Sequence, residues 1–216
     1  MNVPPGGKLE RFFAFFEKYG TERLNGLDES YFDGMSPTER AEAWNFLAEG
    51  FQLSTDKIKG LFVLDKISAV ELFKKEVDSP IPSSPYATER QSLQSDRLLM
   101  LRCIYNVDPD EKYIAAMTEF SNSEFDEIRG EFADSLPASP VTHSAVDALK
   151  RMIFTEAEKI PLSFAIMKLM SIHGLVFDSQ DSIYKSIYMA LASNDVKDKI
   201  AGMERLERHQ LPAYVE

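Results

Sequence analysis

Apolar residues recur along this chain at intervals of three and four positions and rarely at two. Intervals of three and four place side chains on one face of an α-helix, whereas strict alternation is typical of a β-strand. Near the start of the chain the stripe is Leu9, Phe12 and Phe16, and towards its end Ile183 and Ile187 follow the same rule. The spacing therefore predicts an all-α fold of about ten helices in antiparallel pairs.

Signals for helix starts support this interpretation. Ser36 can cap a helix that has Pro37 at its first position, and Glu39 can complete a capping box with Ser36. Further along, Ser121 is expected to open a helix, and Asn194 is expected to cap the last one.

Proline-rich stretches interrupt the helical pattern in two places, 78–86 and 136–141. Proline removes a backbone donor and clashes with the preceding helical turn, so neither stretch is expected to be helical. We expect one domain over residues 1–216, with these two stretches as the places where subdomains would separate.

The stretch Ala190–Ala201 resembles the turn of a HEAT-like helical repeat. A helix ends there, an Asn or Asp caps the next one, and a Val, a basic residue and an Ala follow at helical spacing. The resemblance covers about one repeat, and it implies helix pairs stacked as an irregular α-solenoid. An irregular helical bundle explains the same pattern, so both arrangements stay open.

The charge balance restricts the partners that the chain can have. With 24 Lys and Arg against 35 Asp and Glu, its formal net charge is −11. This sign argues against binding to nucleic-acid phosphates or to anionic lipid, and it suits a basic protein partner. The single cysteine, Cys103, cannot form an internal disulfide, which favours a cytoplasmic location. No membrane-spanning helix is expected, and the sequence leaves the oligomeric state open.

Much of the negative charge lies between residues 106 and 140. This stretch contains nine carboxylates and two basic residues, so its net charge is −7. Glu124, Glu127 and Glu131 stand at i, i+3 and i+7, which predicts a solvent-facing ridge on one helix. An ordinary solvated helix face explains the same run. The alternative is a docking surface for a basic protein, and its candidate partner-binding residues are Glu124, Asp126, Glu127, Glu131 and Asp134.

Motifs for catalysis are missing from the sequence. The three histidines lie far apart, and no phosphate-binding glycine loop or hydrolase elbow occurs. No metal site, cofactor or catalytic residue is therefore expected. Cys103 lies in a helical apolar stripe and is interpreted as a buried, inert thiol.

Three functional hypotheses follow. Compact acidic helical proteins of this kind resemble the bacterial immunity proteins, and this resemblance implies a non-catalytic module that binds and neutralises a basic toxin. The alternative is a helical enzyme or small-ligand receptor with a pocket between helices, built from residues such as His173, Tyr184 and Tyr188. A third hypothesis is a self-associating subunit with an exposed apolar patch around Phe15.

Overall fold

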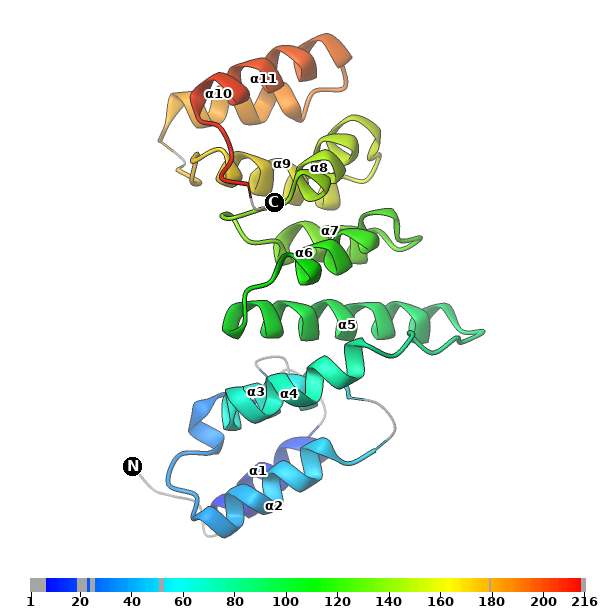
Figure 1. The fold of residues 1–216 in the computed structure, drawn as a ribbon, viewed down its shortest axis with the longest axis vertical. Helices are drawn as coiled ribbons and strands as arrows, with labels where there is room; N and C mark the ends of the chain where they lie inside the picture. Colours follow the sequence, from blue (N-terminus) through cyan, green and yellow to red (C-terminus); the bar gives the residue numbers. More distant parts are fainter. Residues whose placement is uncertain (1–6, 19–22, 24–25, 51–52, 179, 215–216) are drawn as a thin grey trace. The chain divides into compact units, whose positions relative to one another are not determined.

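A computed structural model of the chain describes residues 7–18, 23, 26–50, 53–178 and 180–214 (Figure 1). These residues form eleven α-helices and two short 3-10 helices, and none of them forms a strand, which confirms the all-α prediction. The chain divides into two compact units, Met1–Pro82 and Ser83–Glu216. The boundary lies within the proline-rich stretch 78–86, whereas the stretch 136–141 lies inside the second unit.

The first unit is held together by phenylalanines. Its helices are α1 (Lys8–Glu17), η2 (Glu29–Tyr31), α2 (Pro37–Ala48), α3 (Thr55–Leu64) and α4 (Lys66–Val77). The ring centroid of Phe46 on α2 lies 4.9 Å from that of Phe16 and 5.7 Å from that of Phe12, both on α1. The capping box at the start of α2 is present as predicted, because the Ser36 and Glu39 side chains each accept the other residue's backbone N–H.

The hypothesis of an exposed patch around Phe15 is wrong at that residue. The Phe15 side chain is fully buried, and its ring packs edge-on against Tyr31 at 5.4 Å. The 3-10 turn η2 covers the side of α1 that the helical stripe alone left open, and a distant segment of this kind cannot be inferred from the periodicity of α1.

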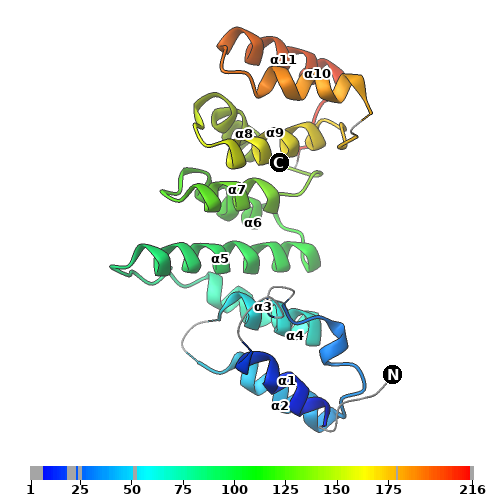
Figure 2. The ribbon, with the colours of Figure 1, turned by 180° about the vertical axis from the view of Figure 1, so that it is seen from behind.

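The second unit consists of helices that stack in successive layers (Figures 1 and 2). They are α5 (Ala87–Val107), α6 (Glu111–Thr118), η3 (Glu119–Asn122), α7 (Asp126–Ser135), α8 (His143–Thr155), α9 (Lys159–Ile172), α10 (Ser182–Leu191) and α11 (Val196–His209). Helix α7 packs mainly on α9, α6 packs on α8, and α10 packs on α11. At Gly130 on α7, an added Cβ would lie 3.3 Å from the Phe164 ring of α9, so the missing side chain allows the two helices to approach closely.

Two predicted helix starts are wrong. Ser121 does not open α7: it lies in the 3-10 turn η3, and its buried hydroxyl accepts a hydrogen bond from Arg151 at 2.9 Å. Helix α7 begins only at Asp126. The N-cap of α11 is Asp195 rather than Asn194, because the Asp195 carboxylate accepts the Lys197 N–H at 2.8 Å.

Basic side chains of one helix reach the C-terminal carbonyls of another. Lys168 on α9 donates to the carbonyls of Asp134 at 3.0 Å and Leu136 at 2.5 Å, at the end of α7. Lys199 on α11, which is 7% exposed, donates to the carbonyl of Ile153 near the end of α8. The last carbonyls of a helix have no partner within it and carry partial negative charge, so both lysines stabilise the layers that they join.

We expect Lys168→Met to lower the free energy of unfolding by about 1–3 kcal/mol, since it leaves the partly buried Leu136 carbonyl and the exposed Asp134 carbonyl without this donor. Chemical denaturation monitored by circular dichroism measures the change. Lys197→Met is the matched control, because Lys197 is exposed, and it should change the stability by less than about 0.5 kcal/mol. Equal effects of the two substitutions would show that the Lys168 hydrogen bonds contribute nothing.

Candidate functional site

The acidic surface predicted from the sequence lies on and beside α7. One side of α7 is buried through Ile128 and Phe132, and the helix contacts α5 on one flank and α9 on another. Glu127, Glu131 and Asp134 are exposed and follow one another at i, i+4 and i+7, so they share the outer face. We call these three residues the α7 ridge.

Glu124 does not belong to this ridge, contrary to the predicted i, i+3, i+7 pattern. It lies in the segment before α7, because the helix starts five residues later than expected. There its two carboxylate oxygens accept hydrogen bonds from the Arg90 guanidinium of α5 at 3.1 and 3.2 Å. Asp126 is the first residue of α7 and is half-buried.

The five candidate carboxylates differ in how far they are already neutralised. Glu124 is paired with Arg90, and Asp134 forms an ion pair of 3.3 Å with Arg102. Within the part of the chain that the structure describes, Glu127 and Glu131 form no ion pair. Asp126 forms no ion pair with a described residue either, but it is half-buried, so the exposed charge that this surface can offer to a partner is concentrated on Glu127 and Glu131.

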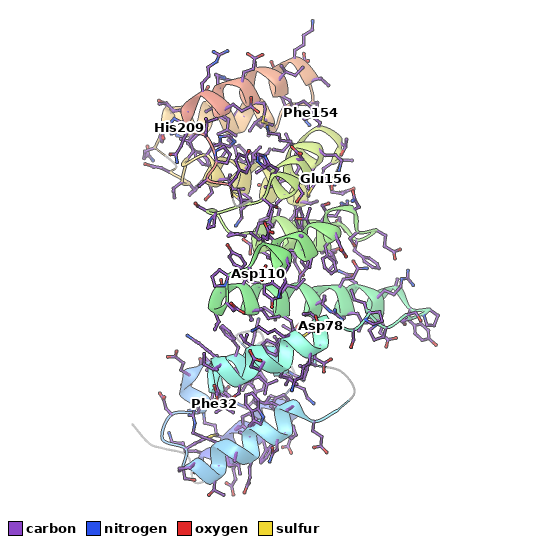
Figure 3. The ribbon with its side chains drawn as sticks, viewed as in Figure 1. Phe32, Asp78, Asp110, Phe154, Glu156 and His209 are labelled. Atoms are coloured by element: carbon purple, nitrogen blue, oxygen red, sulfur yellow. The ribbon has the colours of Figure 1, made fainter. Side chains whose placement is uncertain are left out.

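A salt bridge fixes α7 to the connection between α8 and α9. Arg129 donates to both carboxylate oxygens of Glu156, at 2.6 and 3.0 Å, and also to the Ser123 carbonyl at 2.9 Å. Glu156, labelled in Figure 3, follows the end of α8, and its side chain is only 6% exposed. Hydrogen bonding to Arg129 lowers the pKa of Glu156 and raises that of Arg129. The α7 ridge therefore lies on a helix that is held in place by this salt bridge.

Glu156→Gln should destabilise the protein by about 1–3 kcal/mol at neutral pH, because the largely buried Arg129 guanidinium loses its counter-ion. The lowered pKa of Glu156 means that the stability from this pair is present at neutral pH and lost as the pH falls through that pKa. Denaturation curves of the variant and the parent protein should therefore converge in acid. Glu119→Gln, at an exposed residue of the same unit that does not contact this pair, is the control, and a difference of Glu156→Gln from the parent that persists in acid would contradict this account.

The residues named for a pocket in the second unit are found in separate contacts. His173 is 1% exposed, and its Nδ1 lies 2.5 Å from the Gln210 carbonyl, which follows α11. Tyr188 shares a hydrogen bond of 2.8 Å with Ser163, and Tyr184 is buried with its ring stacked parallel to that of Tyr188. Among the described residues, no hydrogen bond or ring contact joins His173 to either tyrosine.

Burial favours the neutral form of the His173 side chain. Its Nε2 is buried and has no hydrogen-bond partner among the described residues, so a proton placed there would have no acceptor. Burial lowers the pKa of His173 below the ordinary 6.5, the Gln210 carbonyl and Glu207 act in the opposite direction, and Lys150 and His209 add to the lowering. The unfolded chain therefore binds this proton more readily than the folded one.

We expect the free energy of unfolding to fall as the pH is lowered through about 6.5, because the stability held by neutral His173 is present above the pKa of the unfolded state and is lost below it. In His173→Asn the side-chain amide can donate to the Gln210 carbonyl without titrating, so this part of the pH dependence should vanish. His143→Asn, at an exposed histidine that does not act on the pKa of His173, should retain it. Unchanged pH dependence in His173→Asn would contradict this assignment.

The remaining features to consider are the cysteine, possible metal ligands and possible membrane-spanning helices. Cys103 is buried as predicted, and burial raises the pKa of its thiol to about 11, although Arg102 acts in the opposite direction. The described residues contain no cluster of three or more His, Cys, Asp or Glu side chains that could hold a metal ion. Among the same residues, no helix combines the length and the apolar character needed to cross a bilayer.

The structure also contains a cavity that sequence reasoning missed. It lies in the first unit, has a volume of about 580 Å³, and opens between α2 and the junction of α3 with α4. Its lining consists of Arg40, Ala41, Trp44, Asn45, Leu64, Asp65 and Ser68. One signal existed in the sequence, since Arg40 and Trp44 stand at i and i+4 on α2, so that a cation and an aromatic side chain share one helix face.

Comparison of the chain with models of protein families, with curated proteins and with solved structures gave no match. Neither the HEAT-like resemblance nor the immunity-type resemblance is therefore supported or refuted by a relative. Any functional inference must come from the residues themselves.

Proposed function

We propose that this chain is a non-catalytic protein-interaction module that docks a basic protein on the α7 ridge. The observation that carries the proposal is that Glu127 and Glu131 are exposed and form no ion pair with any described residue. Both lie on a helix whose opposite side is buried against other helices. Helix α7 is held by its contacts with α5 and α9 and by the Arg129–Glu156 salt bridge. Because the surface is already ordered, binding loses less conformational entropy than it would on a mobile segment.

The chemistry of the ridge indicates the chemistry of the partner. Carboxylates spaced by one helical turn can accept charge-assisted hydrogen bonds from Lys or Arg side chains, and Arg suits this best because it donates two parallel bonds. The overall charge of −11 would speed the encounter with a basic protein and would repel nucleic acid. Asp126, Glu124 and Asp134 lie close to Glu127 and Glu131 in the sequence and extend the negative field.

Within this class we propose an immunity-type inhibitor that occludes the active site of a basic toxin such as a nuclease. Two features support it: the resemblance of the chain to acidic helical immunity proteins, and the layered helix pairs of the second unit, which fit a HEAT-like arrangement (Figure 1). We also propose a cytoplasmic location, because the sequence has a single cysteine and this thiol is buried and reduced. We do not expect a membrane or nucleic-acid partner.

The double variant Glu127→Lys/Glu131→Lys tests the proposal. Proteins captured from a lysate of the native source are identified at low and at moderate salt, and the purified partner is then titrated against each variant. We expect a basic partner whose affinity falls with salt, and whose association is at least about tenfold slower with the double variant. The matched control, Glu17→Lys/Glu42→Lys, makes the same charge change at exposed residues of the first unit and should bind within about twofold of the parent protein.

Two outcomes would contradict the proposal. One is a stoichiometric partner that binds the double variant as tightly as the parent protein. The other is that no basic protein is retained even at low salt, where electrostatic attraction is strongest.

A further inference from the structure

The cavity of the first unit contains one oriented positive group, the Arg40 guanidinium. Arg40 is half-buried, and its Nη2 donates to the Leu64 carbonyl, the last of α3, at 2.5 Å. This bond uses one of the five N–H groups of the guanidinium and fixes its plane at the wall of the cavity. The remaining donors are in the fork geometry that matches a carboxylate.

The one carboxylate in the lining, Asp65, does not cancel this charge. Its Oδ1 accepts the backbone N–H groups of Ile67 and Ser68, both at 3.1 Å, and its Oδ2 accepts the Ser68 hydroxyl at 2.8 Å. These bonds make Asp65 the N-cap of α4, and the Ser68 hydroxyl and amide are the main causes of its lowered pKa. Its negative charge is stabilised chiefly by the start of α4, and the charge of Arg40 adds a smaller contribution to the lowered pKa, so the two side chains compensate each other only in part. Arg40 keeps N–H groups beyond the one bonded to Leu64 that can bind a ligand.

Trp44, the only tryptophan of the sequence, adds an apolar aromatic surface to the cavity lining. The indole is half-buried and lines the cavity together with Ala41 and Leu64, which gives a flat apolar surface next to the guanidinium. Its N–H has no hydrogen-bond partner among the described residues, and the exposed Asn45 amide adds a further donor. Donors thus outnumber free acceptors in this lining.

We propose that this cavity binds a small organic anion in which one carboxylate is joined to an aromatic ring. The carboxylate lies on the Arg40 fork, and the ring packs on the Trp44 indole, where aromatic pairs gain energy beyond their buried area. A volume of about 580 Å³ falls in the range of small-molecule sites. One cation suits a single negative charge, whereas a doubly charged phosphate would be only half compensated, and a neutral aromatic ring would leave the Arg40 donors unused.

Because Trp44 is the only tryptophan, its fluorescence reports on this cavity alone. The full-length protein is titrated with benzoate, and benzamide, which has the same ring without the charge, is the control ligand. We expect a saturable change with benzoate at a dissociation constant on the order of 1 mM, and binding of benzamide at least about tenfold weaker.

Two pairs of variants separate loss of binding from loss of folding. Arg40→Gln removes the charge and should weaken benzoate binding at least about tenfold, while Arg11→Gln, at an arginine outside the cavity, should not change it. Ala41→Glu places a negative charge on an exposed lining residue without touching the Arg40–Leu64 hydrogen bond, and it should abolish binding. Ala41→Lys, at the same position, should keep or strengthen it.

The proposal is overturned if benzoate gives no saturable change, if benzamide binds equally well, or if Ala41→Glu binds benzoate like the parent protein. Circular dichroism of each variant establishes that the helices are retained. Because the cavity lies in the first unit and the α7 ridge in the second, loss of benzoate binding leaves the proposed protein interaction untouched, and the reverse also holds.

Discussion

The structure depends on hydrogen bonds between basic side chains and the last carbonyl groups of neighbouring helices. Most of the helices are 8 to 14 residues long, and helices of that length are marginal in water without tertiary contacts. Their last carbonyls lack partners, and among the described residues a basic side chain from another helix supplies the donor at four of these ends: Lys57 for α2, Arg40 for α3, Lys168 for α7 and Lys199 for α8. Each of these bonds joins two helices while it completes one of them.

The same use of basic residues explains why the surface is acidic where it is. Lys168 and Lys199 are directed at carbonyls, and Arg90, Arg102 and Arg129 are paired with carboxylates of the second unit. A chain with 24 basic and 35 acidic residues that uses its cations in this way leaves carboxylates such as Glu127 and Glu131 without an ion-pair partner among the described residues. The charge of the α7 ridge is a result of internal packing as much as of composition.

Sequence reasoning succeeded where the signal is local. The spacing of apolar residues indicated the helices, and Ser36 and Glu39 formed the expected capping box because both partners lie within one turn. Sequence reasoning failed where a residue distant in the sequence binds the side chain that a local motif would use. Ser121 has the side chain of an N-cap, but Arg151 engages its hydroxyl, and α7 therefore starts late and excludes Glu124 from the ridge. The cavity was out of reach for the same reason, since Trp44 and Asp65 come together only through tertiary packing.

Each unit carries one unique side chain. Trp44 is the only tryptophan and lies in the first unit, and Cys103 is the only cysteine and lies buried in the second. A thiol reagent reaches Cys103 only when the structure around it opens, so the rate of labelling reports the opening of the second unit. Tryptophan emission reports the melting of the first unit. The cooperativity between the two halves of the intact chain can thus be followed without any substitution in the sequence.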